Sequence, residues 1–482
     1  MHRMASGGNS AGMNSHAHRH ESSNHESRIT NILVRFAPSP TGWLHVGNLR
    51  TALVNYLFAK HHGGQFMLRI DDTDRERSRD EYEDGIRHDL DWMGFKVDLH
   101  TKQSERFDRY DLAKARLIET GRLYPCYETA EELDIKRKML VGRGLPPIYD
   151  RAALKLTDAQ KAQYESEGRR PHWRFKMNHA PIMWDDLIRG SVAFEGANIS
   201  DPVLIREDGV ALFTLSTSVD DGEMPITHIL RGEDHVSNTA VQVQVMEALG
   251  HTPPRFGHMA LLKMKEGKIS KREGGGDIRS LREGGVFPLV LASYLAKIGT
   301  SDAIELADSL DELVQQFDIR KLGRAMANYD PEELARLNLK QWHRTSYEQA
   351  VELSGDGRLT PSIWEVIRPN VKSKEDIFSL LSVFTNDGVI YADARSDSKD
   401  RDYLKTAASL LPTGEWNEVA WENFVAALKQ ETGRKGKDLF MPLRLALTAD
   451  QEGFELKNLF LQLGRDTVQA RLLDAAGMTM NP

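Results

Sequence analysis

The spacing of apolar and polar residues predicts alternating strands and helices in the first part of the chain. An apolar run over 32–37 is closed by Pro38 and Pro40, which indicates a buried strand that ends in a turn. Apolar residues at helical spacing predict a helix over 47–62, and residues 65–70 predict a second strand. A strand, a helix and a strand within ~40 residues form a βαβ unit, which indicates a parallel sheet.

The same pattern returns later in the chain. Residues 225–231 predict a strand, and residues 238–249 predict a helix with Ser237 as its N-cap and Gly250 as its stop. From about residue 287 the pattern is that of one helix after another, joined by short loops. The expected fold class is therefore an α/β catalytic domain of the Rossmann type with a parallel sheet, followed by an all-α part.

Composition divides the chain into three parts. Residues 1–28 consist mainly of Ser, Asn, Gly, His and Met with almost no branched apolar side chains, so we expect a disordered arm. Residues 29–330 are assigned to the α/β domain, and the charge-rich segment 124–201 is expected to be an insertion between its two halves. Residues 331–482 are assigned to a helical region.

The charge balance excludes some classes of protein. The 482 residues carry 63 Lys and Arg against 71 Asp and Glu, which gives a formal net charge of −8. This mild acidity argues against a protein that coats nucleic acid, although it leaves room for local basic patches. The longest nearly apolar stretch, 286–296, is shorter than the ~20 residues that a membrane span requires. We therefore expect no membrane partner.

The chain contains one cysteine, Cys126. One thiol cannot form an intrachain disulfide, and it cannot supply a structural zinc site that needs two or more thiolates from one chain. This usage fits a reducing compartment, and the segment 1–28 lacks the apolar core of a secretory signal. A cytoplasmic location is the expectation.

The first candidate for chemistry is the segment 35–48, between a strand end and a helix start. In a parallel sheet this is the place where ligands bind, because the helix N-terminus offers free N–H groups and a partial positive charge to a phosphate. Gly47 would let a nucleotide approach the backbone closely, and His45 could donate a hydrogen bond to phosphate oxygens. Taken alone, such a His-x-Gly sequence is more often a structural turn.

The second candidate is the segment 265–282, which holds six basic and three acidic side chains. On its own, a loop rich in Lys and Gly is usually a solvated surface loop. A mobile loop with Lys268 and Lys271 could also neutralise charge on a triphosphate as it rearranges. The glycines at 274–276 would permit the loop to open and close.

Together the two segments resemble the signatures of class I aminoacyl-tRNA synthetases, namely PSPTGWLHVG at 38–47 and KISKR at 268–272. LRIDDTDRERS at 68–78, THILRGEDHVSNT at 227–239 and GRKGKDLFMPLRLALT at 433–448 are similar to segments of bacterial glutamyl-tRNA synthetases. The resemblance runs from about residue 31 to the C-terminus. It implies ATP-dependent ligation of L-glutamate to the 3′ end of tRNA through a glutamyl-adenylate, with release of AMP and diphosphate.

The resemblance also implies three sets of site residues. The catalytic set is His45, Gly47, Lys268, Ser270 and Lys271. The ATP-binding set is Pro40, Thr41, His45, Gly47, Asn48, Glu233 and Lys271. The glutamate-binding set is Arg35, Ala37, Ser39, Asp71, Phe213, Thr217 and Arg231, in which the arginines receive the carboxylates while Asp71 and Ser39 receive the α-amino group.

Three positions depart from the family pattern. Many relatives place a longer acid at the position of Asp71, and many have a tyrosine in place of Phe213 that touches the substrate carboxylate. Thr217 is a donor that could compensate for the missing hydroxyl. Some relatives hold zinc in the inserted segment through Cys-x-Cys and a later pair, whereas this chain reads Pro-Cys126-Tyr-Glu. The resemblance is therefore to the form without zinc, and the only metal expected is Mg²⁺ that arrives with ATP.

The family assigns a role to each further part of the chain. Segment 124–201 would bind the acceptor end of the tRNA, a region toward 285–330 would contact its stem, and 331–482 would bind the anticodon. The expected partners are ATP, L-glutamate and tRNA-Glu, tRNA-Gln or both, and a monomer is expected. The densest basic group of the helical region consists of Arg434, Lys435 and Lys437, which are candidates for phosphate contacts, although such a group often only solvates a loop.

Other functions were weighed against this one. A small-molecule nucleotidyltransferase of related fold would not need ~150 further residues of helix. A truncated relative that modifies a tRNA base would lack the same region, and a tRNA-binding paralogue without catalysis would not need His45, Lys268 and Lys271. A paralogue that charges chiefly tRNA-Gln with glutamate, for later amidation, remains an open alternative.

Overall fold

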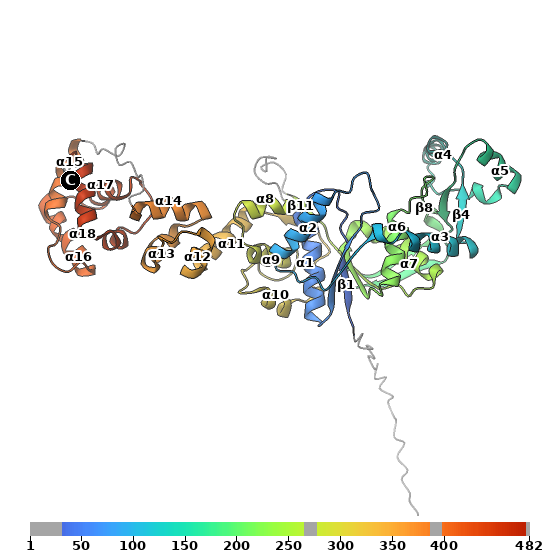
Figure 1. The fold of residues 1–482 in the computed structure, drawn as a ribbon, viewed down its shortest axis with the longest axis horizontal. Helices are drawn as coiled ribbons and strands as arrows, with labels where there is room; N and C mark the ends of the chain where they lie inside the picture. Colours follow the sequence, from blue (N-terminus) through green and yellow to red (C-terminus); the bar gives the residue numbers. More distant parts are fainter. Residues whose placement is uncertain (1–30, 265–276, 386–397, 479–482) are drawn as a thin grey trace, which may run out of the picture.

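The computed structural model describes residues 31–264, 277–385 and 398–478. The arm expected over 1–28 and the residues Lys268, Ser270 and Lys271 lie outside these ranges. Within the described residues, no helix is long and apolar enough to span a membrane. The molecule is elongated, with a parallel sheet near its middle, α4 (Ala130–Gly142) and α5 (Asp158–Ser166) at one end and the C-terminal helices at the other (Figure 1).

The central sheet has five parallel strands in the order β10-β9-β1-β2-β3. Their bounds are Leu33–Phe36 for β1, Gln65–Ile70 for β2, Leu99–Lys102 for β3, His228–Gly232 for β9 and Arg255–Met259 for β10. The chain adds β2 and β3 on one side of β1 and later returns to add β9 and β10 on the other. The expected parallel sheet and Rossmann-type fold class are confirmed.

Helices cover both faces of the sheet because successive side chains of a strand point to opposite faces. Phe66 and Leu68 of β2 belong to the core that contains α1 (Val46–His61), whereas Met67 belongs to the core that contains Leu117 of α3 and Leu215 of α6. Helices α2 (Asp80–Trp92) and α9 (Pro288–Lys297) contribute to the first core. Helices α3 (Phe107–Glu119), α6 (Phe213–Glu223) and α7 (Val236–Leu249) contribute to the second.

Two predicted details of the βα units are wrong. The helix predicted from 238 begins at Val236, directly after the 3₁₀ turn η4 (Glu233–His235), so His235 precedes it and Ser237 lies in its first turn. The 3₁₀ turn starts the helical path earlier than a serine cap would. The predicted stop is confirmed, because Gly250 has φ +87° and ends α7 in the left-handed region that glycine favours.

Between the two halves of the sheet, the chain forms a smaller antiparallel unit. Its sheet has the order β4-β5-β8, with β4 at Leu123–Cys126, β5 at His172–Phe175 and β8 at Val203–Ile205. A hairpin of β6 (Pro181–Asp186) and β7 (Gly190–Glu195) follows β5. Short 3₁₀ turns are η1 (Gln103–Glu105), η2 (Ala152–Lys155) and η3 (Gly196–Asn198).

After the sheet the chain is mainly helical. The elements as far as α14 are α8 (Ile278–Glu283), α10 (Leu310–Gln316), η5 (Ile319–Lys321), α11 (Pro331–Arg344), α12 (Tyr347–Ser354), α13 (Pro361–Ile367), η6 (Arg368–Asn370) and α14 (Lys374–Thr385). The last four are α15 (Ser398–Ser409), α16 (Glu418–Thr432), α17 (Lys437–Thr448) and α18 (Leu456–Ala475). Arg434, one of the candidates for phosphate contacts, forms an ion pair with Asp400 at 2.6 Å.

One strand interrupts the run of helices predicted from residue 287. It is β12 (Ala327–Tyr329), which pairs in parallel with β11 (Leu262–Met264). Tyr329 is buried, and this burial within the first core favours an extended segment over another helix. The pairing fastens the strand that precedes residue 265 to the chain that leads into α11.

Helix α11 joins two separate hydrophobic cores. Its Leu334 and Leu337 belong to the core of the sheet, while Trp342 belongs to the core of the C-terminal helices. Phe287 packs against both cores and meets Trp342 edge to face, with 4.7 Å between ring centroids. The backbone N–H of Phe287 donates to the side chain of Asn338 at 3.0 Å. The two halves of the molecule are therefore connected through one continuous helix.

Candidate active site

A cavity of about 650 Å³ lies where the strand order of the sheet reverses. Strands β1 and β9 are neighbours there, and the chain leaves them toward opposite edges of the sheet. Because the strands are parallel, their carboxyl ends share one edge, and this is where open α/β sheets bind ligands. The predicted residues that line the cavity are Arg35, Ala37, His45, Gly47, Asn48, Asp71, Phe213 and Arg231.

The other predicted residues lie elsewhere. Ser39 and Thr41 line a second cavity of about 680 Å³, which shares Asp71 and Phe213 with the first. The residues that line neither cavity are Pro40, Thr217 and Glu233. The Glu233 carboxylate is held by Arg189 at 2.7 Å and accepts from the backbone N–H of Leu261 at 3.3 Å.

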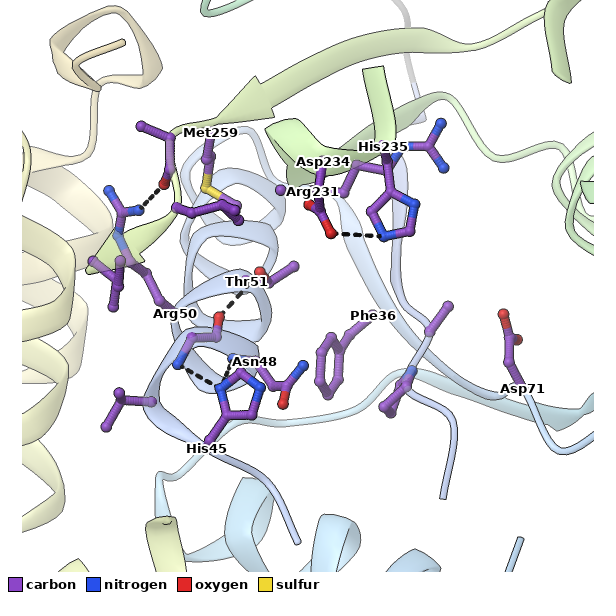
Figure 2. Close-up of a pocket in the computed structure, with 18 of the residues that line it drawn as sticks. Phe36, His45, Asn48, Arg50, Thr51, Asp71, Arg231, Asp234, His235 and Met259 are labelled. Atoms are coloured by element: carbon purple, nitrogen blue, oxygen red, sulfur yellow. Dashed lines mark hydrogen bonds and ion pairs between the residues drawn. The ribbon is translucent and has the colours of Figure 1, made fainter. Parts of the chain in front are cut away.

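His45 caps the N-terminus of α1. Its Nδ1 accepts hydrogen bonds from the backbone N–H groups of Gly47 at 3.1 Å and Asn48 at 3.3 Å (Figure 2). These two N–H groups are therefore occupied by the histidine, whereas the sequence predicted that the helix start would present them free. Since Nδ1 accepts, the proton of the neutral ring lies on Nε2, which can donate to an incoming group.

Gly47 leaves the space that the His45 ring occupies. A Cβ built on Gly47 would lie 2.9 Å from Cε1 and 3.0 Å from Nδ1 of that ring. Either contact is closer than packed carbon atoms tolerate. A side chain at this position would push the ring off the helix end, so the glycine is needed for the cap as well as for the approach of a ligand.

The two ends of the Lys-rich segment lie beside this cap. Leu261 and Leu262, which precede the segment, line the cavity. Asp277, the first described residue after 264, forms an isolated backbone bridge with His45, and Ile278 donates its N–H to the carbonyl of Leu44 at 2.9 Å. The fold therefore places the described residues on either side of 265–276 next to the first stretch.

Arg231 is a buried cation at the end of β9. Its Nη2 donates to Thr239 Oγ1 at 2.7 Å and to Gln242 Oε1 at 2.5 Å, and its Nε donates to His258 Nε2 at 3.4 Å. Among the described residues, Nη1 has no hydrogen-bond partner and no carboxylate forms an ion pair with this guanidinium. Burial and the nearby Arg35 lower the pKa of Arg231 to about 9, which leaves it cationic at neutral pH.

Arg35, at the end of β1, has a different environment. Its Nε and Nη2 both donate to the carboxylate of Asp221, each at 3.1 Å. Arg69 donates from Nη1 to the same carboxylate at 2.7 Å and from Nε to Asp71 at 2.7 Å. Burial opposes the charge on Asp221, yet the two guanidinium groups lower the pKa of this carboxyl below its ordinary value. The four side chains form a buried network with balanced charges.

Asp71 faces the cavity from the end of β2, across from His45 (Figure 2). Burial raises the pKa of this carboxyl to about 6, although the adjoining Arg69 and Arg35 work in the opposite direction. The group is therefore charged at neutral pH but titrates close to it.

The wall between the two cavities is formed by Phe213, the first residue of α6. Its ring lies against that of His235, with 5.6 Å between centroids. Thr217, proposed as a compensating donor, is fully buried one turn later, and its Oγ1 has no partner among the described residues. Asp234 also lines the cavity and lies 3.8 Å from His235 Nε2.

Several residues of the site were not found from the sequence. Asp221 lies in a helix of otherwise small and apolar residues, and the pair Asp220-Asp221 in that buried pattern is a signal that could have indicated it. Thr239 lies within a quoted family segment. Asp186 and His258 carry no local signal, because their roles depend on contacts between distant parts of the chain.

Cys126 lies in a closed environment in the inserted unit. Burial raises the pKa of its thiol to about 12, so at neutral pH it is a thiol and not a metal-binding thiolate. Tyr149 is close to it and donates its hydroxyl to Glu128 at 2.8 Å. Within the described ranges, no group of three or more His, Cys, Asp or Glu residues is arranged to hold a metal ion.

These features define a class of protein. A parallel sheet with a cavity at its switch point, a histidine-capped helix start and two buried arginines is suited to a nucleotide together with a small anionic compound. Residues 31–336 match the family model of the catalytic domain of class I tRNA synthetases (E and Q), and residues 333–476 match that of an anticodon binding domain. The chain belongs to this family of class I tRNA synthetases.

Individual relatives cover most of the chain. It is 50% identical over 446 residues to a glutamate–tRNA ligase of Azospirillum brasilense, a match that spans 92% of this chain and 98% of the relative. It is 49% identical over 449 residues to glutamate–tRNA ligase 1 of Maricaulis maris, with 92% and 99% covered. The crystal structure of a glutamate tRNA ligase from Elizabethkingia meningosepticum, in complex with its amino acid, superposes with a TM-score of 0.80 at 27% identity, covering 93% of this chain and all of that one.

Proposed function

We propose that this chain ligates L-glutamate to the 3′ end of tRNA at the expense of ATP, through a glutamyl-adenylate. The observation that carries the proposal is Arg231, a buried cation without a carboxylate partner among the described residues, in the same cavity as the His45 cap. A buried charge is costly unless it is paired, so the site is built to receive an anion. The relatives named glutamate–tRNA ligase support glutamate as that anion.

The first half of the reaction is a displacement at phosphorus. A carboxylate oxygen of glutamate attacks the α-phosphorus of ATP, the bond from that phosphorus to the bridging oxygen breaks, and diphosphate leaves. His45 would donate from Nε2 to a phosphate oxygen, with Gly47 and Asn48 holding the ring in place. The family resemblance assigns Lys268, Ser270 and Lys271 to the charge that develops on the leaving diphosphate.

The other proposed contacts follow from the same assignment. Arg231 and Arg35 would receive the two carboxylates of glutamate, and Asp71 would receive its ammonium group. Ala37, Ser39, Phe213 and Thr217 complete the proposed glutamate set, and Pro40, Thr41, Asn48 and Glu233 complete the ATP set. The position of Glu233, held by Arg189 outside the cavity lining, favours a role in shaping the turn after β9.

No resident metal is required by this proposal. Mg²⁺ would enter with ATP as part of the substrate and shield its phosphates. We infer that the inserted unit carries no zinc, which is supported by the high pKa of the Cys126 thiol and by its contact with Tyr149.

The remaining parts of the chain would bind tRNA. Segment 124–201 would hold the acceptor end, the region toward 285–330 its stem, and 331–482 the anticodon. The match to an anticodon binding domain over 333–476 supports the last assignment. We further propose that the enzyme acts in the cytoplasm as a monomer.

The proposal is tested by charging unfractionated bacterial tRNA with radiolabelled glutamate. We expect acid-precipitable label that requires ATP and Mg²⁺ and is lost in His45→Ala. Charging that is independent of ATP, or no charging of any tRNA, would overturn the proposal. Modification of an internal base, which survives mild alkaline deacylation, would instead identify a tRNA-modifying enzyme.

A second candidate differs only in the tRNA. Some relatives carry numbered names, such as glutamate–tRNA ligase 1 of Maricaulis maris and glutamate–tRNA ligase 2 of Erythrobacter litoralis. The second candidate is a paralogue that would charge chiefly tRNA-Gln with glutamate for later amidation. Comparing kcat/KM on purified tRNA-Glu and tRNA-Gln separates the two.

A further inference from the structure

A series of buried, hydrogen-bonded side chains holds the guanidinium of Arg231. Thr239 Oγ1 accepts from Arg231 and lies 2.8 Å from His258 Nε2, and His258 Nδ1 lies 2.5 Å from Asp186 Oδ2. Each of these side chains is at most 5% exposed. The series crosses from α7 through β10 to the end of β6 and so joins elements that are distant in sequence.

The chemistry of each group decides which one donates and which one accepts in this series of hydrogen bonds. The guanidinium can only donate, so Thr239 Oγ1 and His258 Nε2 both accept from it. The threonine hydroxyl lies 2.8 Å from His258 Nε2 and 3.2 Å from the carbonyl of His235, and donation to the nearer His258 extends the link. His258 therefore carries its proton on Nδ1 and donates it to Asp186. Burial, reinforced by repulsion from Arg231, lowers the pKa of His258 and keeps the ring neutral.

Asp186 is held in place by backbone groups as well as by the histidine side chain. Its Oδ1 accepts from the backbone N–H groups of Ile188, Arg189 and His258, each at 3.0 Å. Burial disfavours its charge, but these bonds and the one from His258 lower its pKa below the ordinary value. Asp186 is thus a fixed anion that sets the tautomer of His258 without forming an ion pair with Arg231.

We propose that Thr239, His258 and Asp186 are positioning residues that hold Arg231 for the substrate and make the site select an acid over an amide. This inference rests on the proposed function of the site. The neutral contacts occupy Nη2 and Nε and leave Nη1 without a partner among the described residues. Since no carboxylate of the described residues forms an ion pair with it, Arg231 gains more from a substrate carboxylate than from a neutral amide.

A purely structural role is the competing explanation, since Asp186 also fastens the β6–β7 hairpin to β10 through the backbone of His258. Thr239 separates the two explanations. Its hydroxyl links Arg231 to His258 but makes no bond to the hairpin, and valine has nearly the same shape as threonine. Thr239→Val therefore removes the link and preserves the packing, while Thr239→Ser keeps the hydroxyl.

The experiment compares these two variants with the full-length enzyme in tRNA charging. We expect Thr239→Val to raise the KM for glutamate about tenfold, as for the loss of a hydrogen bond to a charged group, with little change in the KM for ATP. Thr239→Ser should restore most of the affinity. Thr345→Val removes a buried hydroxyl at the C-terminal end of α11 whose one hydrogen bond to the described residues is to the carbonyl of Gln341, and it should leave both constants unchanged.

Selectivity is measured on the same variants by using glutamine as a competitor of glutamate. Thr239→Val should let glutamine compete about tenfold better relative to glutamate, because a loosened Arg231 loses its preference for charge. An unchanged glutamate KM in Thr239→Val, or equal rises in the constants for glutamate and ATP, would overturn the positioning role. If Arg231→Ala itself leaves the glutamate KM unchanged, the proposed function of Arg231 fails instead.

Discussion

The ends of β1 and β9 carry two arginines whose surroundings are opposite in character. Arg35 shares the Asp221 carboxylate with Arg69, so its charge is already balanced inside the protein. Arg231 is held by Thr239, Gln242 and His258, none of which is charged at neutral pH. Both side chains are 5% exposed and line the same cavity, so burial does not distinguish them.

This difference shows that the partners of a charged residue decide what it can bind. A substrate carboxylate that approaches Arg35 meets a guanidinium whose charge is shared with a neighbouring anion. One that approaches Arg231 meets a charge for which the described residues supply no anion. We therefore expect the two arginines to contribute unequally to glutamate binding, although the sequence alone predicted the same carboxylate contact for both.

The largest effect is expected from Arg231→Ala. Removing the unpaired cation leaves a substrate carboxylate buried without its partner, which costs on the order of 2–5 kcal/mol. The KM for glutamate in tRNA charging should rise about a hundredfold or more, with a small change in the KM for ATP. Arg116→Ala, which removes an exposed pair with Glu119, serves as the control and should leave both constants unchanged.

Arg35→Ala should raise the glutamate KM less and reduce stability more. Its loss leaves Asp221 with Arg69 as its remaining cation, and breaking a buried ion pair costs on the order of 3–5 kcal/mol. Urea denaturation should therefore show a lower midpoint for Arg35→Ala than for Arg231→Ala. Equal glutamate constants in the two variants would contradict the asymmetry between the strand ends.

The pH dependence of glutamate use should report Asp71. Its raised pKa, about 6, means that acidification neutralises this carboxylate earlier than an ordinary aspartate, and a neutral Asp71 cannot balance the substrate ammonium. We expect kcat/KM for glutamate to be constant above this pKa and to fall tenfold per pH unit below it. In Asp71→Asn the value should be low and nearly independent of pH in the same range. A wild-type profile that stays flat to pH 5 would remove Asp71 from the ammonium site.

The smallest effect is expected from Phe213→Tyr. A hydroxyl on this ring would add one donor to the cavity wall, and a hydrogen bond is worth ~1 kcal/mol. The glutamate KM should fall about fivefold. Phe378→Tyr adds a hydroxyl to a similarly exposed ring in the helical region and should have no effect. An increased KM in Phe213→Tyr would show that the wall next to His235 excludes polar atoms.

The sequence predicted the local structure of the site well because short-range patterns determine it. Strand β2 has the predicted bounds, and α1 begins at Val46, one residue before its predicted start. The periodicity of apolar residues contains this information. The His45 cap was missed, although a glycine two residues after a histidine at a helix start leaves room for the ring on the helix end.

Contacts between distant residues could not be predicted in the same way. Asp221 follows Arg35 by 186 residues, and His258 follows Asp186 by 72. Nothing near either aspartate in the chain specifies its partner, because the sheet order and the packing of α6 and β6 bring the groups together. The roles of Lys268 and Lys271 lie outside the described residues and stay predictions.

Helix α11 fixes how the core of the C-terminal helices is rotated relative to the core of the sheet. Leu337 is anchored in one core and Trp342 in the other, so a change in the number of residues between them both rotates and shifts one core relative to the other. One inserted residue would rotate the C-terminal core by about 100° and advance it by about 1.5 Å, whereas an insertion close to a whole turn would nearly restore the original azimuth. The lengths of this connector that keep the two cores in register are therefore set by the helical pitch, and the surfaces proposed to bind tRNA at the two ends of the molecule would stay aligned only at those lengths.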